Sequence, residues 1–95
     1  MPLNIWLEVR RAYRDLRRYS DEEDKEVIGR EVRYFIITHD EETLRRVRDL
    51  AVRALDRRDR RINRDGMAYA LGMIGFQLEQ IDRQEQLEHA YDSQT

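Results

Sequence analysis

The side chains best suited to metal chemistry in this sequence are two histidines and their acidic neighbours. His89 shares a predicted helix face with Glu85 and Asp92, and imidazole with carboxylates is a ligand set for divalent metals. A true metal site also needs hydrogen bonds that orient its ligands, which an exposed helix end does not supply, so we expect no metal. His39 lies in the stretch THDEE at a predicted helix start, where a capping or solvent-exposed role is expected.

Nucleophilic catalysis has few candidate residues. The chain contains no cysteine, which excludes disulfides, thiolate metal ligands and a cysteine nucleophile. Its two serines are Ser20, a predicted helix cap, and Ser93, near the C-terminus. The four glycines form no phosphate-binding loop. We therefore predict that the protein is not an enzyme and binds no cofactor.

Arginine is the residue type with the clearest chemical potential. The stretch LRRVRDLAVRALDRRDRRINRD, residues 44–65, holds nine arginines, and the chain has a single lysine, Lys25. Guanidinium groups pair bidentately with carboxylates or phosphates. On a helix that continues through residue 62, several of these arginines share an arc of about 60°. The candidate partner or polyanion surface consists of Arg46, Arg53, Arg57, Arg60, Arg61 and Arg64, assisted by Arg10, Arg14, Arg17 and Arg18.

The charge pattern favours arginines that are paired inside the fold. Residues 1–19 carry a net charge of +3, residues 20–42 of −6, residues 43–64 of +6 and residues 65–95 of −5. Sequence neighbours pack together in an up-down bundle, so each basic helix would lie beside acidic ones. Glu42, Asp49 and Asp56 also precede an arginine by four residues, which is the favourable order on a helix. The net charge of −2 points the same way, because it repels nucleic acid at long range.

Length and composition predict one small helical domain. Of its 95 residues, 40% are hydrophobic and 40% are charged, with a single proline. Apolar residues recur at three- and four-residue spacing in four segments, about 3–19, 21–37, 41–62 and 67–90. The stretches SDEE and THDEE are typical of helix starts, NRDG of a helix end, and residues 91–95 are expected to fray. Residues 32–38, VRYFIIT, suit a helix or a strand by composition, and a helix is preferred because no pairing strand is evident.

The predicted core follows the apolar spacing within each segment. Trp6 and Tyr13 are expected to widen the apolar stripe of the first segment. Tyrosine among arginines can stack on bases, but Tyr13 and Tyr19 fall on the apolar stripe, which favours a core role. The predicted core residues are Ile5, Val9, Ala12, Leu16 and Tyr19; Val27, Ile28, Val32, Phe35 and Ile36; Leu44, Val47, Leu50, Ala51, Ala54 and Leu55; and Leu71, Ile74, Leu78 and Ile81.

The fourth segment offers a further packing face. Its most apolar part, residues 66–78, is shorter than the about 20 residues that a membrane span needs. Ala68, Gly72 and Gly75 form a strip of small residues, which predicts a helix-packing or dimer face. Each glycine inside a helix costs up to about 1 kcal/mol relative to alanine, and close packing would offset that cost. The first residues lack the pattern of a signal peptide, so a cytoplasmic location is expected.

These observations predict an all-α protein, in which residues 1–95 form a single compact, antiparallel four-helix bundle. A homodimer stays open as a further prediction. The leading functional hypothesis is a non-catalytic protein-interaction module, such as an adaptor, an inhibitor or an accessory subunit of a larger complex, with a protein partner. The alternative is a nucleic-acid or polyanion-binding protein that uses the arginine-rich face of the third helix.

Overall fold

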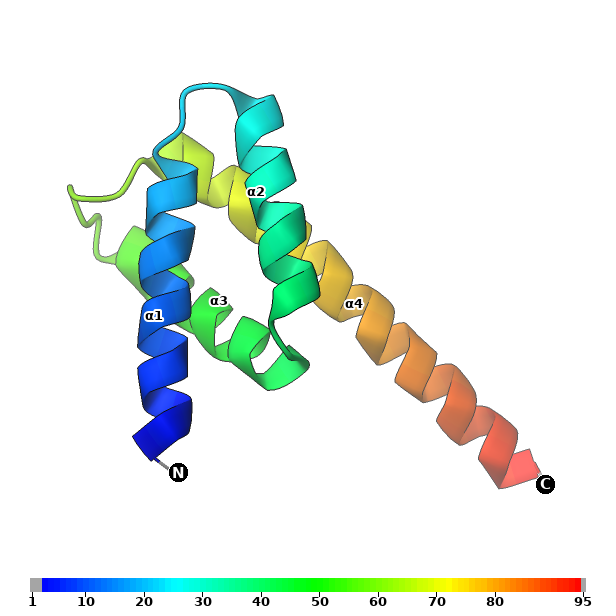
Figure 1. The fold of residues 1–95 in the computed structure, drawn as a ribbon. Helices are drawn as coiled ribbons and strands as arrows, with labels where there is room; N and C mark the ends of the chain where they lie inside the picture. Colours follow the sequence, from blue (N-terminus) through cyan, green and yellow to red (C-terminus); the bar gives the residue numbers. More distant parts are fainter. Residues whose placement is uncertain (1–2, 95) are drawn as a thin grey trace.

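The structure, a computed structural model, describes the backbone of residues 3–94 and the side chains of residues 4–90, and it contains four α-helices (Figure 1). They are α1 (Leu3–Ser20), α2 (Lys25–Thr38), α3 (Glu41–Asp56) and α4 (Arg64–Gln94). The described residues include no strand, and residues 32–38 are helical. The all-α, four-helix fold predicted from the sequence is therefore confirmed. Over the described residues, none of the helices is both long enough and apolar enough to cross a membrane.

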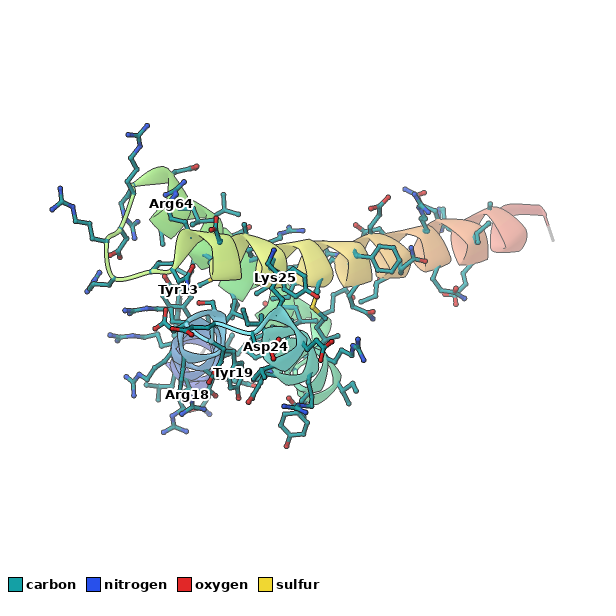
Figure 2. All side chains as sticks on the ribbon, turned by 90° about the horizontal axis from the view of Figure 1, so that it is seen from above. Tyr13, Arg18, Tyr19, Asp24, Lys25 and Arg64 are labelled. Atoms are coloured by element: carbon teal, nitrogen blue, oxygen red, sulfur yellow. The ribbon has the colours of Figure 1, made fainter. Side chains whose placement is uncertain are left out.

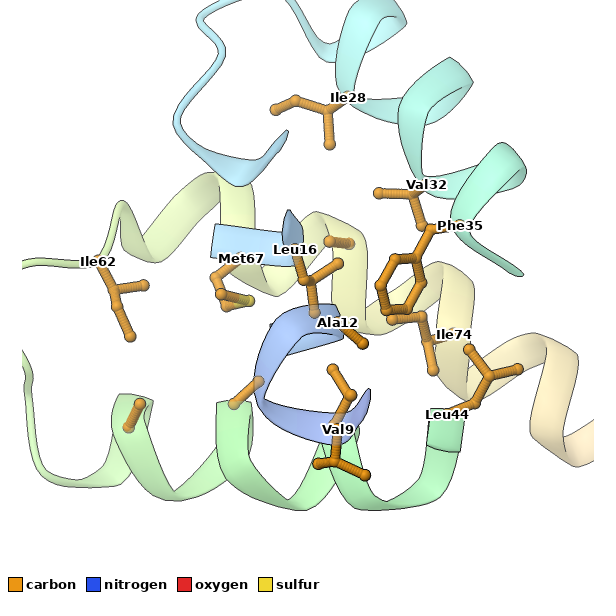
Figure 3. Close-up of a cluster of buried hydrophobic side chains, with 14 of the residues drawn as sticks. Val9, Ala12, Leu16, Ile28, Val32, Phe35, Leu44, Ile62, Met67 and Ile74 are labelled. Carbon is orange, nitrogen blue, oxygen red and sulfur yellow. The ribbon is translucent and has the colours of Figure 1, made fainter. Parts of the chain in front are cut away.

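One apolar core joins the four helices (Figure 3). Phe35 and Val32 of α2 point into it, which explains why the β-branched end of that segment is helical: the three-residue spacing buries both side chains on one face. Burying a side chain of this size contributes roughly 1.5–3 kcal/mol. The buried hydrophobic residues are Val9, Ala12, Leu16, Ile28, Val32, Phe35, Leu44, Val47, Ala51, Ala54, Ile62, Met67, Ala70, Ile74 and Leu78.

The helices pack in a different order from the predicted up-down bundle. Figure 1 shows α1 and α2 side by side and running in opposite directions, while α4 crosses the pair and continues beyond it. Helix α1 contacts α2, α3 and α4, and α3 contacts α1 and α4. In a square up-down bundle α1 and α3 would be diagonal and α2 and α3 adjacent. Here α1 packs directly on α3, whereas α2 and α3 barely touch.

The link between α1 and α2 shows that one predicted cap was wrong. Asp24 caps α2, since its side chain accepts a hydrogen bond from the backbone N–H of Glu26 at 2.9 Å. Helix α2 therefore begins at Lys25, not near residue 21. Ser20 does not cap it, because its buried hydroxyl donates to the carbonyl oxygen of Arg17 at 2.8 Å. Of the two residues in THDEE that suit a helix cap, Thr38 and Asp40, it is Asp40 that caps α3, and the backbone N–H of Thr43 keeps the pKa of Asp40 below its usual value.

Helix α3 ends at Asp56, six residues before the predicted position. Arg58 adopts a left-handed conformation with φ of 55°. The backbone N–H of Asp59 donates to Ala54 and that of Arg58 to Leu55, at 3.1 and 3.0 Å, which is a Schellman motif. Glycine is the usual residue at this position, because the left-handed conformation costs other residues roughly 1–2 kcal/mol. Residues 57–63 therefore form a loop, and the arginines beyond Asp56 do not continue the helix face.

The stretch NRDG begins α4 instead of ending α3. The side chain of Asn63 accepts a hydrogen bond from the backbone N–H of Gly66 at 3.0 Å, so Asn63 is the cap of α4. Gly66 is buried in the first turn, where a Cβ atom would overlap the carbonyl oxygen of Ser20. The glycine is needed for this close approach rather than for a helix end. Helix α4 continues through Gln94, so the expected fraying of residues 91–94 is not observed, and Thr95 lies outside the described residues.

Candidate functional site

The two arginine-rich helices lie against each other along one contact. At one end, the guanidinium carbon of Arg46 lies 5.9 Å from the centroid of the Trp6 ring. At the other end, Tyr13 lies close enough to Arg57 and Arg61 for both charges to act on its hydroxyl. The first turns of α1 thus face the first turns of α3, and the middle of α1 faces the end of α3 and the loop that follows it. The two helices run in the same general direction along this contact.

Two adjoining grooves follow the contact between α1 and α3, and Leu50 lines both. Together they form what we call the arginine seam. Its residues are Trp6, Val9, Arg10, Tyr13, Arg14, Arg17, Arg46, Asp49, Leu50 and Arg53. Five of these ten side chains are arginines and a single one is acidic, so the seam is strongly cationic.

The seam arises from regular spacing on both helices. On α1, Trp6, Arg10, Tyr13 and Arg17 follow one another at intervals of four, three and four residues, which places them on one face. On α3, Arg46, Leu50 and Arg53 repeat the first two of these intervals. Aromatic rings therefore alternate with guanidinium groups along α1. The alternation of aromatic residues and arginines is visible in the sequence. Apolar spacing alone, however, assigns the rings to the core and separates them from the arginines.

The predicted arginine surface divides into occupied and unpaired groups. Three of its members have internal partners: Arg46 pairs with Glu42 at 3.0 Å, Arg61 with Asp59 at 2.8 Å, and Arg64 donates to the carbonyl oxygen of Leu55 at 2.8 Å. Among the described side chains, the following arginines of α1, α3 and the 57–63 loop have no ion-pair partner: Arg10, Arg11, Arg14, Arg17, Arg53, Arg57, Arg58 and Arg60.

The loop of residues 57–63 extends the cationic surface beyond Tyr13. Asp59, whose side chain is only 12% exposed, accepts hydrogen bonds from the side chain and the backbone N–H of Arg61, and these hold the pKa of Asp59 well below its usual value. Burial raises the pKa of Tyr13, and the nearby charge of Arg17 partly opposes that rise. In Figure 2, Tyr13 lies between α1 and this loop, and nitrogen-tipped side chains extend outward from both.

Pairing between helices accounts for few of the arginines. Of the ion pairs between described side chains, one joins two helices, Arg45 of α3 with Asp82 of α4 at 2.6 Å. The predicted pair Glu42–Arg46 forms, but Asp49 lies beside Arg48 at 3.8 Å instead of pairing with Arg53. The predicted Asp56–Arg60 pair is absent from the described residues because α3 ends at Asp56. Each basic helix contacts an acidic one as predicted, but the hypothesis of mutual neutralisation is largely wrong, since a single ion pair between described side chains joins two helices.

The histidines and three carboxylates near α4 were candidates for metal binding. Oxygens of Glu41, Asp82 and Glu85 lie within 4.8 Å of one another. Arg45 donates to both Glu41 and Asp82, so two of the three carboxylates already have a guanidinium partner. His39 bonds through Nδ1 to the carbonyl oxygen of Phe35 at 2.8 Å, at the end of α2. His89 is exposed, and the side chain of Asp92 lies outside the described residues.

The small-residue strip of α4 faces outward. A Cβ atom added at Gly72 or Gly75 would meet no other atom within 4 Å, and Ala68 is exposed. No helix in the described part of the chain therefore packs on this strip. Packing inside the fold does not offset the cost of the two glycines, and the dimer face stays a prediction.

Comparison with known proteins assigns this chain to no family. No protein-family model, no curated protein and no solved structure matches it. The class of protein therefore follows from the fold and the site: it is a small all-α domain of four helices with a cationic, aromatic-lined seam between α1 and α3.

Proposed function

We propose that this protein is a non-catalytic binding protein whose arginine seam binds a phosphate-rich polyanion. The observation that carries the proposal is the convergence of Arg10, Arg14 and Arg53 on one groove system, with no ion-pair partner among the described side chains. Like charges that share a groove repel each other, and a bound anion removes that repulsion. Phosphate also matches the planar guanidinium fork.

The net charge of the chain does not oppose this function, because the charges are segregated. Residues 3–20 and 41–63 each carry +3, whereas residues 21–40 and 64–94 each carry −4. Exposed charges are screened over about 8–10 Å at physiological salt, so a ligand in the seam responds mainly to the arginines around it. Glu22 and Glu23 of the α1–α2 link line a groove with Asn63 and Gly66 at the start of α4, where acidic side chains complement the positive end of that helix.

The salt dependence of polyanion binding tests the proposal. A fluorescently labelled single-stranded oligonucleotide and inorganic polyphosphate are titrated with the protein at about 50 mM and about 200 mM salt. The four seam arginines without an ion-pair partner, Arg10, Arg14, Arg17 and Arg53, would make about four phosphate contacts. The affinity should then fall about 50- to 150-fold between these salt concentrations, because binding releases counterions from the polyanion. Fluorescence anisotropy measures the oligonucleotide, and competition with it measures polyphosphate. No binding of either polymer at the lower salt concentration would exclude the proposed function.

The proposal includes neither a catalytic step nor a cofactor. The histidine and carboxylate side chains with resolved contacts act in capping and ion pairs, which supports a binding role. A cytoplasmic location belongs to the same proposal, since phosphate-rich polymers are abundant in that compartment.

A second candidate function is a protein-interaction module that uses the outward face of α4. Phe76 and Leu87 are 64% and 68% exposed, and both lie on the face that carries Gly72. Large exposed apolar side chains next to small residues are typical of interaction surfaces. If a second copy covers this face, the mass in solution is that of a dimer, and Gly72→Leu returns it to a monomer with the helical content retained. A monomer at high micromolar concentration would exclude self-association.

A further inference from the structure

We infer that the polyanion bound by the arginine seam is a single-stranded nucleic acid whose bases stack on Trp6 and Tyr13. This inference rests on the proposed function and specifies its ligand. It depends on the two rings, because a site for phosphate alone needs no aromatic side chain.

The rings are placed where a ligand in the seam would meet them. Trp6 is 44% exposed, and it lines the groove that contains Arg46 and Arg53. Tyr13 lines the adjoining groove, which contains Arg10, Arg14 and Arg17. The guanidinium carbon of Arg17 lies 6.0 Å from the centroid of the Tyr13 ring. Each groove therefore joins a ring to the guanidinium groups that would hold a phosphate.

The spacing of the rings suits a polynucleotide strand. Trp6 and Tyr13 are seven residues apart on one face of α1, which separates them by about 10.5 Å along the helix axis. A strand that follows α1 would therefore pass both rings within a few nucleotides. Arg10 lies between the two rings on the same face, in position to hold a phosphate between the two stacked bases.

The polar groups of the seam favour a single strand without strong sequence preference. Bases in a duplex are stacked on each other and cannot reach rings inside a groove, whereas unpaired bases can. Guanidinium groups and rings accept any base, which is typical of sequence-tolerant single-strand binding.

The fluorescence of Trp6 gives a direct test, because it is the only tryptophan in the chain. The protein is titrated with oligothymidylate of about 12 nucleotides, with a duplex of the same length, and with inorganic polyphosphate. We expect the single strand to bind most tightly and to quench Trp6 fluorescence by stacking. Polyphosphate is expected to bind with no such quenching.

Substitution of the ring separates stacking from charge. Trp6→Leu should weaken single-strand binding about tenfold and leave the affinity for polyphosphate within about twofold, while Trp6→Phe should retain most of the binding. Tyr34→Leu removes an exposed aromatic ring of α2, outside the seam, and should change neither affinity. Circular dichroism establishes that each variant is folded. For the variants that lack tryptophan, the anisotropy of fluorescently labelled oligothymidylate measures the affinity for the single strand. Competition of polyphosphate with this labelled strand measures the affinity for polyphosphate.

The outcomes distinguish the inference from the proposed function. Equal affinity for all three polymers, or an unchanged affinity of Trp6→Leu for the single strand, would overturn stacking and leave polyanion binding intact. Tighter binding to the duplex would also overturn it. The absence of binding to any of the three polymers would overturn both proposals.

Discussion

Gly66→Ala is expected to lower the free energy of unfolding by about 3 kcal/mol, the largest effect among alanine substitutions of the four glycines. The added Cβ atom would overlap the carbonyl oxygen of Ser20, the last residue of α1. A backbone oxygen cannot rotate away as a long side chain can. The start of α4 would have to move away from the end of α1, which would also loosen the packing of the buried Met67 in the next position.

Chemical denaturation of the variant measures this effect, with Gly72→Ala as the matched control. The same substitution at Gly72 adds a methyl group in open space on the same helix. It should raise the free energy of unfolding by up to about 1 kcal/mol, because alanine has the higher helix propensity. Two identical substitutions thus change stability in opposite directions. A Gly66→Ala protein as stable as the wild type would show that α1 and α4 do not approach each other so closely.

The triple variant Arg10→Gln, Arg14→Gln and Arg53→Gln is expected to weaken polyanion binding about 100-fold at about 0.1 M salt. These arginines line the seam and have no ion-pair partner among the described side chains, so the substitutions remove no internal pair. The slope of log affinity against log salt should fall by about 2 to 3 units, since three phosphate contacts are lost. The free energy of unfolding should change little. Anisotropy titrations over a range of salt concentrations measure both the affinity and its dependence on salt.

A second triple variant controls for the change in net charge. Lys25, Arg30 and Arg33 are exposed on α2, away from the seam, and their replacement by glutamine removes the same three charges. Binding should then weaken by less than about threefold, because distant charges are screened. An equal loss in both variants would show that the total charge of the protein, and not the seam, governs binding.

The sequence alone determined the fold class and most of the core. Spacing of three and four residues decides which side chains of a helix share a face, and it does so without knowledge of the neighbouring helices. Val9, Leu16, Val32 and Ile74 are buried as that spacing predicts. The start of α3 at Glu41 was also predictable, because the capping side chain of Asp40 acts on backbone N–H groups within its own first turn.

The tertiary structure decided where the other helices begin and end. Arg58 holds the left-handed position that ends α3, although nothing in its residue type indicates that conformation. Glycine at position 66 is typical of a helix end, yet Gly66 lies inside the first turn of α4. The residue is a glycine because the carbonyl oxygen of Ser20, in another helix, leaves no room for a Cβ atom. Contacts between residues far apart in the sequence select these positions, so local patterns assign them wrongly.

Only the tertiary structure brought the arginines of α1 and α3 together. The alternation of charge along the chain suggested the opposite arrangement, in which each basic helix is neutralised by acidic neighbours. An exposed ion pair contributes about 0–1 kcal/mol, whereas each large apolar side chain in the core contributes roughly 1.5–3 kcal/mol. Burial of the apolar faces therefore determined which helices touch, and the arginines beside those faces were placed together as a consequence.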